Sequence, residues 1–116
     1  MIGINTRTSP YRLDSKSKEP IDLYIKLTNG SIKKLLSIDL VIDEDLSFSS
    51  VKPIHTDYKR LGEFTANQVK EIRYSIYPAV GSYPGLKKVK IRVGEHSKDY
   101  NLIDNHTEST ISINMI

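Results

Sequence analysis

One segment of the chain gathers the side chains that most often bind metal ions. Neutral imidazole and carboxylate groups suit Zn²⁺ or Mn²⁺. The segment carries Glu95, His96, Asp99, Asp104, His106 and Glu108. Their spacing matches no established ligand pattern, and loops between strands are rich in the same residues because water solvates them. We therefore predict a solvated polar loop here, without a metal ion or another cofactor.

Enzymatic chemistry would need a nucleophile and a base at a workable spacing. The chain contains no HExxH, P-loop, GxSxG or GxGxxG motif, and its histidines stand at no recognisable spacing from a nucleophile. The absence of cysteine excludes thiolate metal sites, cysteine nucleophiles and disulfides. We predict that the protein is not an enzyme.

A row of cations in the segment 86–93 offers a different chemistry. Apolar and basic residues alternate there, with Leu86, Val89, Ile91 and Val93 on one side and Lys88, Lys90 and Arg92 on the other. Cations on one face of a strand repeat about every 7 Å, close to the spacing of phosphates along a nucleic-acid strand. Nucleic-acid binding is therefore an alternative function. Its binding residues would be Lys87, Lys88, Lys90 and Arg92, with Lys33 and Lys34 as further cations.

The main interpretation of this row is simpler. A strand half buried in a sheet must expose polar residues to water, and lysines there also discourage pairing between sheet edges. A dedicated nucleic-acid surface combines more basic residues with clustered aromatic side chains, whereas this chain has a net charge of only +3. Tyr24 and Tyr77 fall on outward positions of other predicted strands, where tyrosines can act as contact anchors. We include both tyrosines among the candidate binding residues.

The elements that position these residues are strands. Apolar residues recur at every second position in most of the chain, and no segment shows the spacing of an amphipathic helix. Strands that each expose one face bury the other most simply when two sheets pack face to face. We predict one domain over residues 1–116, an all-β, two-sheet antiparallel immunoglobulin-like sandwich of about seven or eight strands.

The same alternation predicts the core. The inward positions are Ile21, Leu23, Ile25, Leu27, Leu36, Ile38, Leu40, Ile42, Ile72, Tyr74, Ile76, Val89, Ile91, Val93, Ile111 and Ile113. Asn29 and Gly30 supply a hairpin or tight-turn signal between two of these strands. We expect the last strand to be paired inside the sandwich, with its two isoleucines Ile111 and Ile113 buried.

Two stretches of the chain carry a family resemblance. In "DLYIKLTNGSIKKLLSIDLVI" a strand ends at Asn-Gly and a second strand follows, and "LGEFTANQVKEIRYSIYPAVGSYPGLKKVKIRV" contains a Leu-Gly turn, a strand, a Pro-Gly turn and an alternating strand. From Ile21 to Val93 the chain resembles the immunoglobulin-like modules of the cell-adhesion-related (CARDB-type) group of archaeal and bacterial proteins. Such modules usually carry Pro-Gly or a similar pair where this chain has 65–67. The resemblance implies a spacer or interaction domain without catalytic residues.

The predicted function is a non-enzymatic protein-interaction or scaffold domain whose partner is another protein. The N-terminal segment has no basic region followed by an apolar one, and no run approaches the roughly 18 apolar residues of a membrane span. We predict a soluble cytoplasmic protein without membrane contact, or else a domain of a larger exported protein. The sequence leaves the oligomeric state open.

Overall fold

The structure is a computed structural model that describes residues 2–30, 32–101 and 103–116. Its strands are β1 (Ile2–Ser9), β2 (Arg12–Leu13), β3 (Ile21–Asn29), β4 (Lys34–Ile42), β5 (Leu46–Ser47), β6 (Thr56–Phe64), β7 (Val69–Pro78), β8 (Gly85–His96) and β9 (Asn105–Met115). The described residues form no helix, which confirms the predicted all-β class. In this part of the chain there is accordingly no helix with the length and apolar character needed to cross a membrane.

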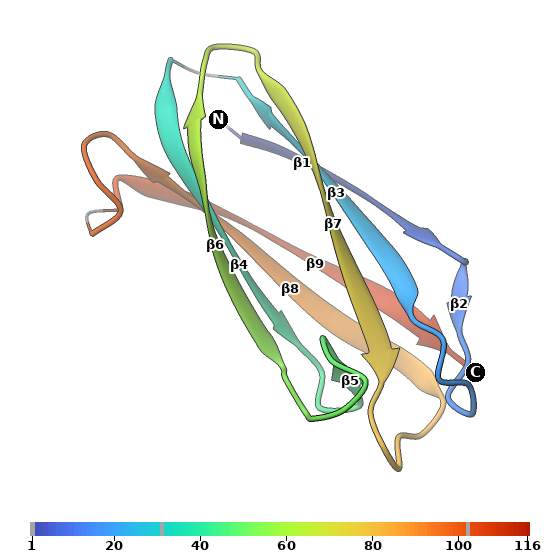
Figure 1. The fold of residues 1–116 in the computed structure, drawn as a ribbon. Coiled ribbons are helices and arrows are strands. Elements are labelled where there is room, and N and C mark those ends of the chain that lie inside the picture. The colour runs from blue at the N-terminus through green and yellow to red at the C-terminus, as the bar shows by residue number, and fades with distance from the viewer. Residues whose placement is uncertain (1, 31, 102) are drawn as a thin grey trace.

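The strands form two sheets that enclose one core (Figure 1). Sheet A has the order β1-β3-β7-β5, and sheet B has the order β2-β9-β8-β4-β6. Paired strands are antiparallel except β2 and β9, which run parallel. The prediction of purely antiparallel sheets is therefore wrong for sheet B. The exception arises because β2 directly follows β1 and continues in its direction after changing sheets.

The alternation in the sequence does not reveal β6, the edge strand of sheet B. When β6 is counted, the described residues form nine strands, whereas the sequence predicted about seven or eight. Two of the nine, β2 and β5, contain only two residues each. Cross-strand partners point to the same face of a sheet. Asp57 and Lys59 of β6 pair with Leu40 and Ile38 of β4, so charged residues stand where the pattern would need apolar ones.

The inward faces predicted for β3, β4 and β8 are buried. Of the predicted core residues, Ile72 and Ile111 are only partly buried and pack against the core from its margin. The core also takes in Ile2, Leu13, Leu46, Phe64 and Met115. Leu86 does not continue the apolar row of β8, because it is 71% exposed. It stands two positions before Lys88 and therefore shares the face of that lysine.

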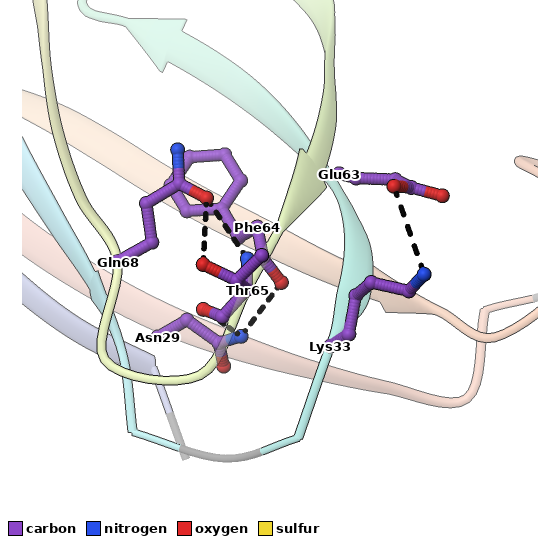
Figure 2. A network of polar contacts seen from close by, with 6 residues as sticks. All are labelled: Asn29, Lys33, Glu63, Phe64, Thr65 and Gln68. Carbon is purple, nitrogen blue, oxygen red and sulfur yellow. Dashed lines mark hydrogen bonds and ion pairs between the residues drawn. The ribbon is translucent and has the colours of Figure 1, made fainter.

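Asn29 is a buried residue that ties two connections together at the end of β3 (Figure 2). Its side-chain amide donates hydrogen bonds to the carbonyl oxygens of Ile32, Phe64 and Thr65, at 2.9, 3.0 and 3.1 Å. Because β3 lies in sheet A and β4 in sheet B, the turn signal at this position marks a crossover between sheets and not a hairpin.

The backbone of Asn29 fixes the β6–β7 connection as well. Its N–H donates to the carbonyl oxygen of Gln68 at 2.9 Å, and its carbonyl accepts from the N–H of Asn67 at 2.7 Å. Asn67 has a φ of 63°, a left-handed conformation that asparagine adopts more readily than most residues. The sharp turn at this point is thus made by an asparagine.

Candidate interaction surfaces

The predicted basic row lies on the outer face of sheet B. Lys88, Lys90 and Arg92 are exposed there, and their strand β8 pairs with β9 on one side and with β4 on the other. Because β8 is an interior strand, these residues do not protect a sheet edge, and that part of the sequence interpretation is wrong.

Lys87 does not belong to this surface. It shares the face of Val89, and its ammonium nitrogen lies 2.6 Å from Oδ2 of Asp45 in the turn before β5. The prediction that Lys87 joins the basic row is therefore wrong, because neighbouring residues of a strand point to opposite faces.

The charge of Arg92 is partly offset by its neighbours. Nε of Arg92 lies 3.9 Å from Oε1 of Glu108 in β9, and Asp39 is its cross-strand partner in β4. Lys88 and Lys90 have neutral cross-strand partners in β9. The row consequently presents less positive charge than its sequence suggests.

The two further cations, Lys33 and Lys34, form ion pairs of their own. Nζ of Lys33 lies 3.9 Å from Oε2 of Glu63 (Figure 2), and Nζ of Lys34 lies 3.4 Å from Oδ2 of Asp104. A hydrogen bond from Ser97, together with Lys34, lowers the pKa of Asp104. Both lysines are paired with carboxylates and add little to the basic row.

Tyr24 and Tyr77 lie on the outer face of sheet A, away from the basic row. The guanidinium carbon of Arg7 stands 3.8 Å from the centre of the Tyr24 ring, a cation–π contact. Tyr77 is half-buried, and its strand pairs with β5 at Ser47. The candidate binding residues are therefore divided between two opposite faces and do not form a single site.

The polar segment 95–108 is a loop only in its middle part, since β8 continues to His96 and β9 begins at Asn105. The loop prediction is therefore wrong for the two ends of the segment, which belong to strands. Glu95 and His96 are buried. Within the residues that the structure describes, no three His, Asp or Glu side chains gather in a group that could hold a metal ion.

The structure brings together a serine and a histidine that the sequence does not associate. Oγ of Ser37 in β4 lies 2.8 Å from Nε2 of His96 in β8, and both residues are buried. The ring of Tyr100 lies beside that of His96 with 5.1 Å between centroids, and its hydroxyl accepts a hydrogen bond from the N–H of Gly62. Through these two contacts, Tyr100 holds the β8–β9 loop against the Ser37–His96 pair. Its one signal in the sequence is Gly94, a glycine inside a strand.

Charged side chains close one lateral side of the molecule, between β6 and β7, which is nearest the viewer in Figure 1. Nζ of Lys59 lies 3.3 Å from Oδ2 of Asp57 and 4.9 Å from the ring centre of Tyr74. Nζ of Lys70 lies 5.0 Å from the ring centre of Phe64. Burial, with Asp57 nearby, raises the pKa of Tyr74. Inward-pointing charges discourage edge pairing, and we call this the guarded side.

The opposite lateral side lies between β1 and β9, and none of its described inward positions carries a charged side chain. These positions are Ile4, Thr6 and Thr8 in β1 and Thr107, Ser109 and Ile111 in β9. Among the described strands, β1 pairs with β3 alone, and the outer edge of β9 meets only the two-residue β2. We call this the open side. Sequence reasoning expected β9 to be paired inside the sandwich, but only one of its edges is covered along its length.

No family model matches the chain, and a search of curated proteins finds no relative. Solved structures nevertheless share its fold. The alkylpurine DNA glycosylase AlkC of Pseudomonas fluorescens, bound to DNA with an abasic-site analogue, has a TM-score of 0.54 at 17% identity. The match covers 98% of this chain but only 30% of the glycosylase.

Two other solved structures match along nearly their whole length. Self-complemented MyfA, the major subunit of Myf fimbriae from Yersinia enterocolitica, has a TM-score of 0.52 at 11% identity, over 97% of this chain and 98% of its own. BslA, a bacterial hydrophobin, has a TM-score of 0.52 at 8% identity, over 99% and 95% of the two chains. At these identities the similarity is one of fold alone.

Proposed function

We propose that the chain is a non-enzymatic protein-interaction module with an immunoglobulin-like sandwich fold, and that it binds extended protein segments along its open side. The observation behind this proposal is the contrast between the two lateral sides. Asp57, Lys59 and Lys70 guard one side, whereas β9 presents an edge without such charges. An edge strand offers N–H and C=O groups to an extended segment, and added main-chain hydrogen bonds provide affinity.

The structural neighbours are compatible with this role. A fimbrial subunit and a hydrophobin consist almost wholly of this fold, whereas in the DNA glycosylase it accounts for 30% of the chain. The fold therefore makes up nearly the whole of a fimbrial subunit and of a hydrophobin. The resemblance to cell-adhesion-related modules implies the same role and stays a prediction.

Nucleic-acid binding by the outer face of sheet B is the competing function. The glycosylase was solved on DNA, and Lys88 and Lys90 are exposed. Affinity for random single-stranded and duplex DNA at two salt concentrations separates the two functions, because phosphate contacts weaken steeply with salt. We expect no salt-dependent binding, and we expect K88S/K90S to behave as the wild type. Salt-dependent binding lost in K88S/K90S would favour the competing function.

A photo-crosslinking residue tests the proposed surface directly. Benzoylphenylalanine replaces Thr110 on the open edge of β9 in one variant and Tyr58 on the guarded edge of β6 in a matched control, both expressed in cells of the source organism. We expect crosslinked protein adducts from position 110 and few from position 58. Equal adducts from both positions, or none from position 110, would contradict the proposed surface.

A further inference from the structure

We infer that one end of the sandwich binds an anionic amphiphile, a small molecule that carries an anionic group on an alkyl chain. The binding site is a hollow where three connections meet, at the end of the molecule that holds β2, β5 and the C-terminal residue (Figure 1). None of the described residues that line this hollow belongs to β9. The inference is therefore independent of the proposed protein-interaction surface and goes beyond it.

The hollow has the size of a small-molecule site. Its volume is about 500 Å³, and small-molecule pockets span roughly 300–1,000 Å³. Its lining comes from three separate parts of the chain, which are residues 15–18, 50–51 and 77–81. A second hollow of about 230 Å³ shares Val51 and Val80 with the first and extends to Lys52 and Pro53. The two hollows adjoin, and together they offer room for an extended chain.

One part of the lining is polar and cationic. Lys16 and Lys18 are exposed there, and neither forms an ion pair with a residue that the structure describes. No Asp or Glu side chain from the described part of the chain lines this hollow. Of the nearest carboxylates along the chain, that of Asp14 accepts a hydrogen bond from the N–H of Lys16 at 2.9 Å, and Glu19 lies outside the lining. The two lysines therefore attract an anion to the hollow.

The rest of the lining is mainly aliphatic. Val51 is 88% exposed and Val80 is fully exposed, so neither side chain packs into the core. Single exposed apolar residues are ordinary on a protein surface, but these two line one hollow together with Pro78 and Ala79. Tyr77 is the only aromatic residue in the described lining. An alkyl chain laid in the hollow removes both valines from water while its anionic end meets the lysines.

Hydrogen bonds hold two of the three connections in place without a ligand. In the β5–β6 connection, the hydroxyl of Ser47 donates to the carbonyl of Lys52 at 3.0 Å and accepts from the N–H of Ile54 at 3.1 Å. In the β2–β3 connection, the N–H of Ser15 donates at 2.7 Å to the carbonyl of Ile116, which follows β9. A site whose walls are already ordered binds without the entropic cost of ordering them.

Titration of the full chain with dodecanoate, followed by nuclear magnetic resonance of the backbone amides, tests the site and locates it. Below the concentration at which dodecanoate forms micelles, we expect saturable shifts confined to residues 15–18, 50–52 and 77–81. Acetate has the charge without the chain, and dodecyl maltoside has the chain without the charge. Each should bind more weakly than dodecanoate, on the order of tenfold or more. Absent or evenly spread shifts, or equal binding of either analogue, would overturn the inference.

Removal of the two lysines tests the cationic part of the lining. K16S/K18S should weaken the binding of dodecanoate on the order of tenfold, because the anionic group loses both of its cations. K26S/K98S is the matched control, since it removes two exposed lysines outside both hollows and changes the net charge by the same amount. We expect this control to bind like the wild type. Equal weakening in the two variants would show that overall charge holds the anion, and would overturn the site.

Removal of the two valines tests the aliphatic part. V51S/V80S should weaken the binding of dodecanoate by a similar factor, because the alkyl chain loses its apolar contacts. V41S/V69S is the matched control, since both of its valines are 46% exposed and lie outside the two hollows. All four double variants change exposed positions, and urea unfolding midpoints equal to that of the wild type verify that they fold. Wild-type affinity in V51S/V80S would overturn the inference.

An anionic lipid headgroup presents the same chemistry as a free amphiphile, and vesicles distinguish the two sources. Vesicles of phosphatidylcholine, alone or mixed with phosphatidylglycerol, are sedimented with the wild type and with K16S/K18S. We expect both proteins to stay in solution with either kind of vesicle, because the hollow takes up a single alkyl chain. Sedimentation of the wild type with the anionic vesicles, lost in K16S/K18S, would assign the lysines to a membrane surface and overturn the free ligand.

Discussion

Oγ of Ser37 lies 2.8 Å from Nε2 of His96, and this buried contact depends on the missing side chain of Gly94. A Cβ atom at position 94 would lie 2.8 Å from Oγ of Ser37 and 3.1 Å from Nε2 of His96. The two polar groups meet across β4 and β8 because the residue between them is a glycine. The relationship gives the first prediction.

Gly94→Ala should destabilise the protein by about 1–3 kcal/mol, because the added methyl group must displace the Ser37–His96 pair in a packed interior. The midpoint of urea unfolding measures the effect. Gly3→Ala is the matched control in β1, since a Cβ there would meet Thr28 at an ordinary 3.7 Å. Equal midpoints for the two variants would show that the pair does not occupy this position.

Asn29→Ala should lower the free energy of unfolding on the order of 2–4 kcal/mol, because buried carbonyl groups that lose a donor cost about 1–3 kcal/mol each. The carbonyls of Phe64 and Thr65 lose their amide donor in this variant. Asn29→Asp keeps the shape of the side chain but supplies no amide hydrogen, so it should be at least as damaging. Asn5→Ala, on the exposed face of β1, serves as the control and should leave the unfolding midpoint unchanged.

Tyr74 should make the protein less stable in alkaline solution. An unperturbed tyrosine has a pKa of 10.0. In the folded protein, burial and, to a smaller extent, the charge of Asp57 raise the pKa of Tyr74 above this value. The folded protein therefore holds the phenolic proton more tightly than the unfolded chain. This contribution is fully present below pH 10 and is lost progressively as the pH rises above it.

Unfolding midpoints between pH 8 and pH 11 check this sign. Tyr74→Phe should lose less stability than the wild type over the upper part of this range and should change little at neutral pH, since the buried hydroxyl has no hydrogen-bond partner in the described residues. Tyr24→Phe removes a hydroxyl from the outer face of sheet A and should follow the wild type. A Y74F profile parallel to the wild type would contradict the prediction.

Core and surface positions of sheet B should respond very differently to truncation. Ile38→Ala and Ile91→Ala remove fully buried side chains and should each cost on the order of 2–5 kcal/mol. Lys90→Ala and Leu86→Ala change exposed positions and should cost well under about 1 kcal/mol. The midpoints of thermal or urea unfolding of the four variants measure this difference. A common midpoint would show that the inward and outward faces of β4 and β8 are wrongly assigned.

The period of two predicted most of the buried faces correctly, because a strand with one face in the core must alternate. Leu23, Ile38 and Ile91 could be placed from this rule alone. The same rule missed β6, where Asp57 and Lys59 occupy inward positions at the edge of the sheet. Apolar residues alternate along a strand only where its inward side chains reach the apolar core. The inward side chains of β6 lie at the margin of the sheet, so charged residues are tolerated there.

Sequence alone determined the all-β class and the alternation of exposed and buried positions, since both depend on local geometry along the chain. It could not decide which strands neighbour one another, because pairing depends on contacts between residues far apart in the sequence. Only the tertiary structure therefore placed Lys87 beside Asp45, Ser37 beside His96, and the basic row in the interior of a sheet. It also decided that β9 keeps an open edge, because β2 pairs with that edge only at its end.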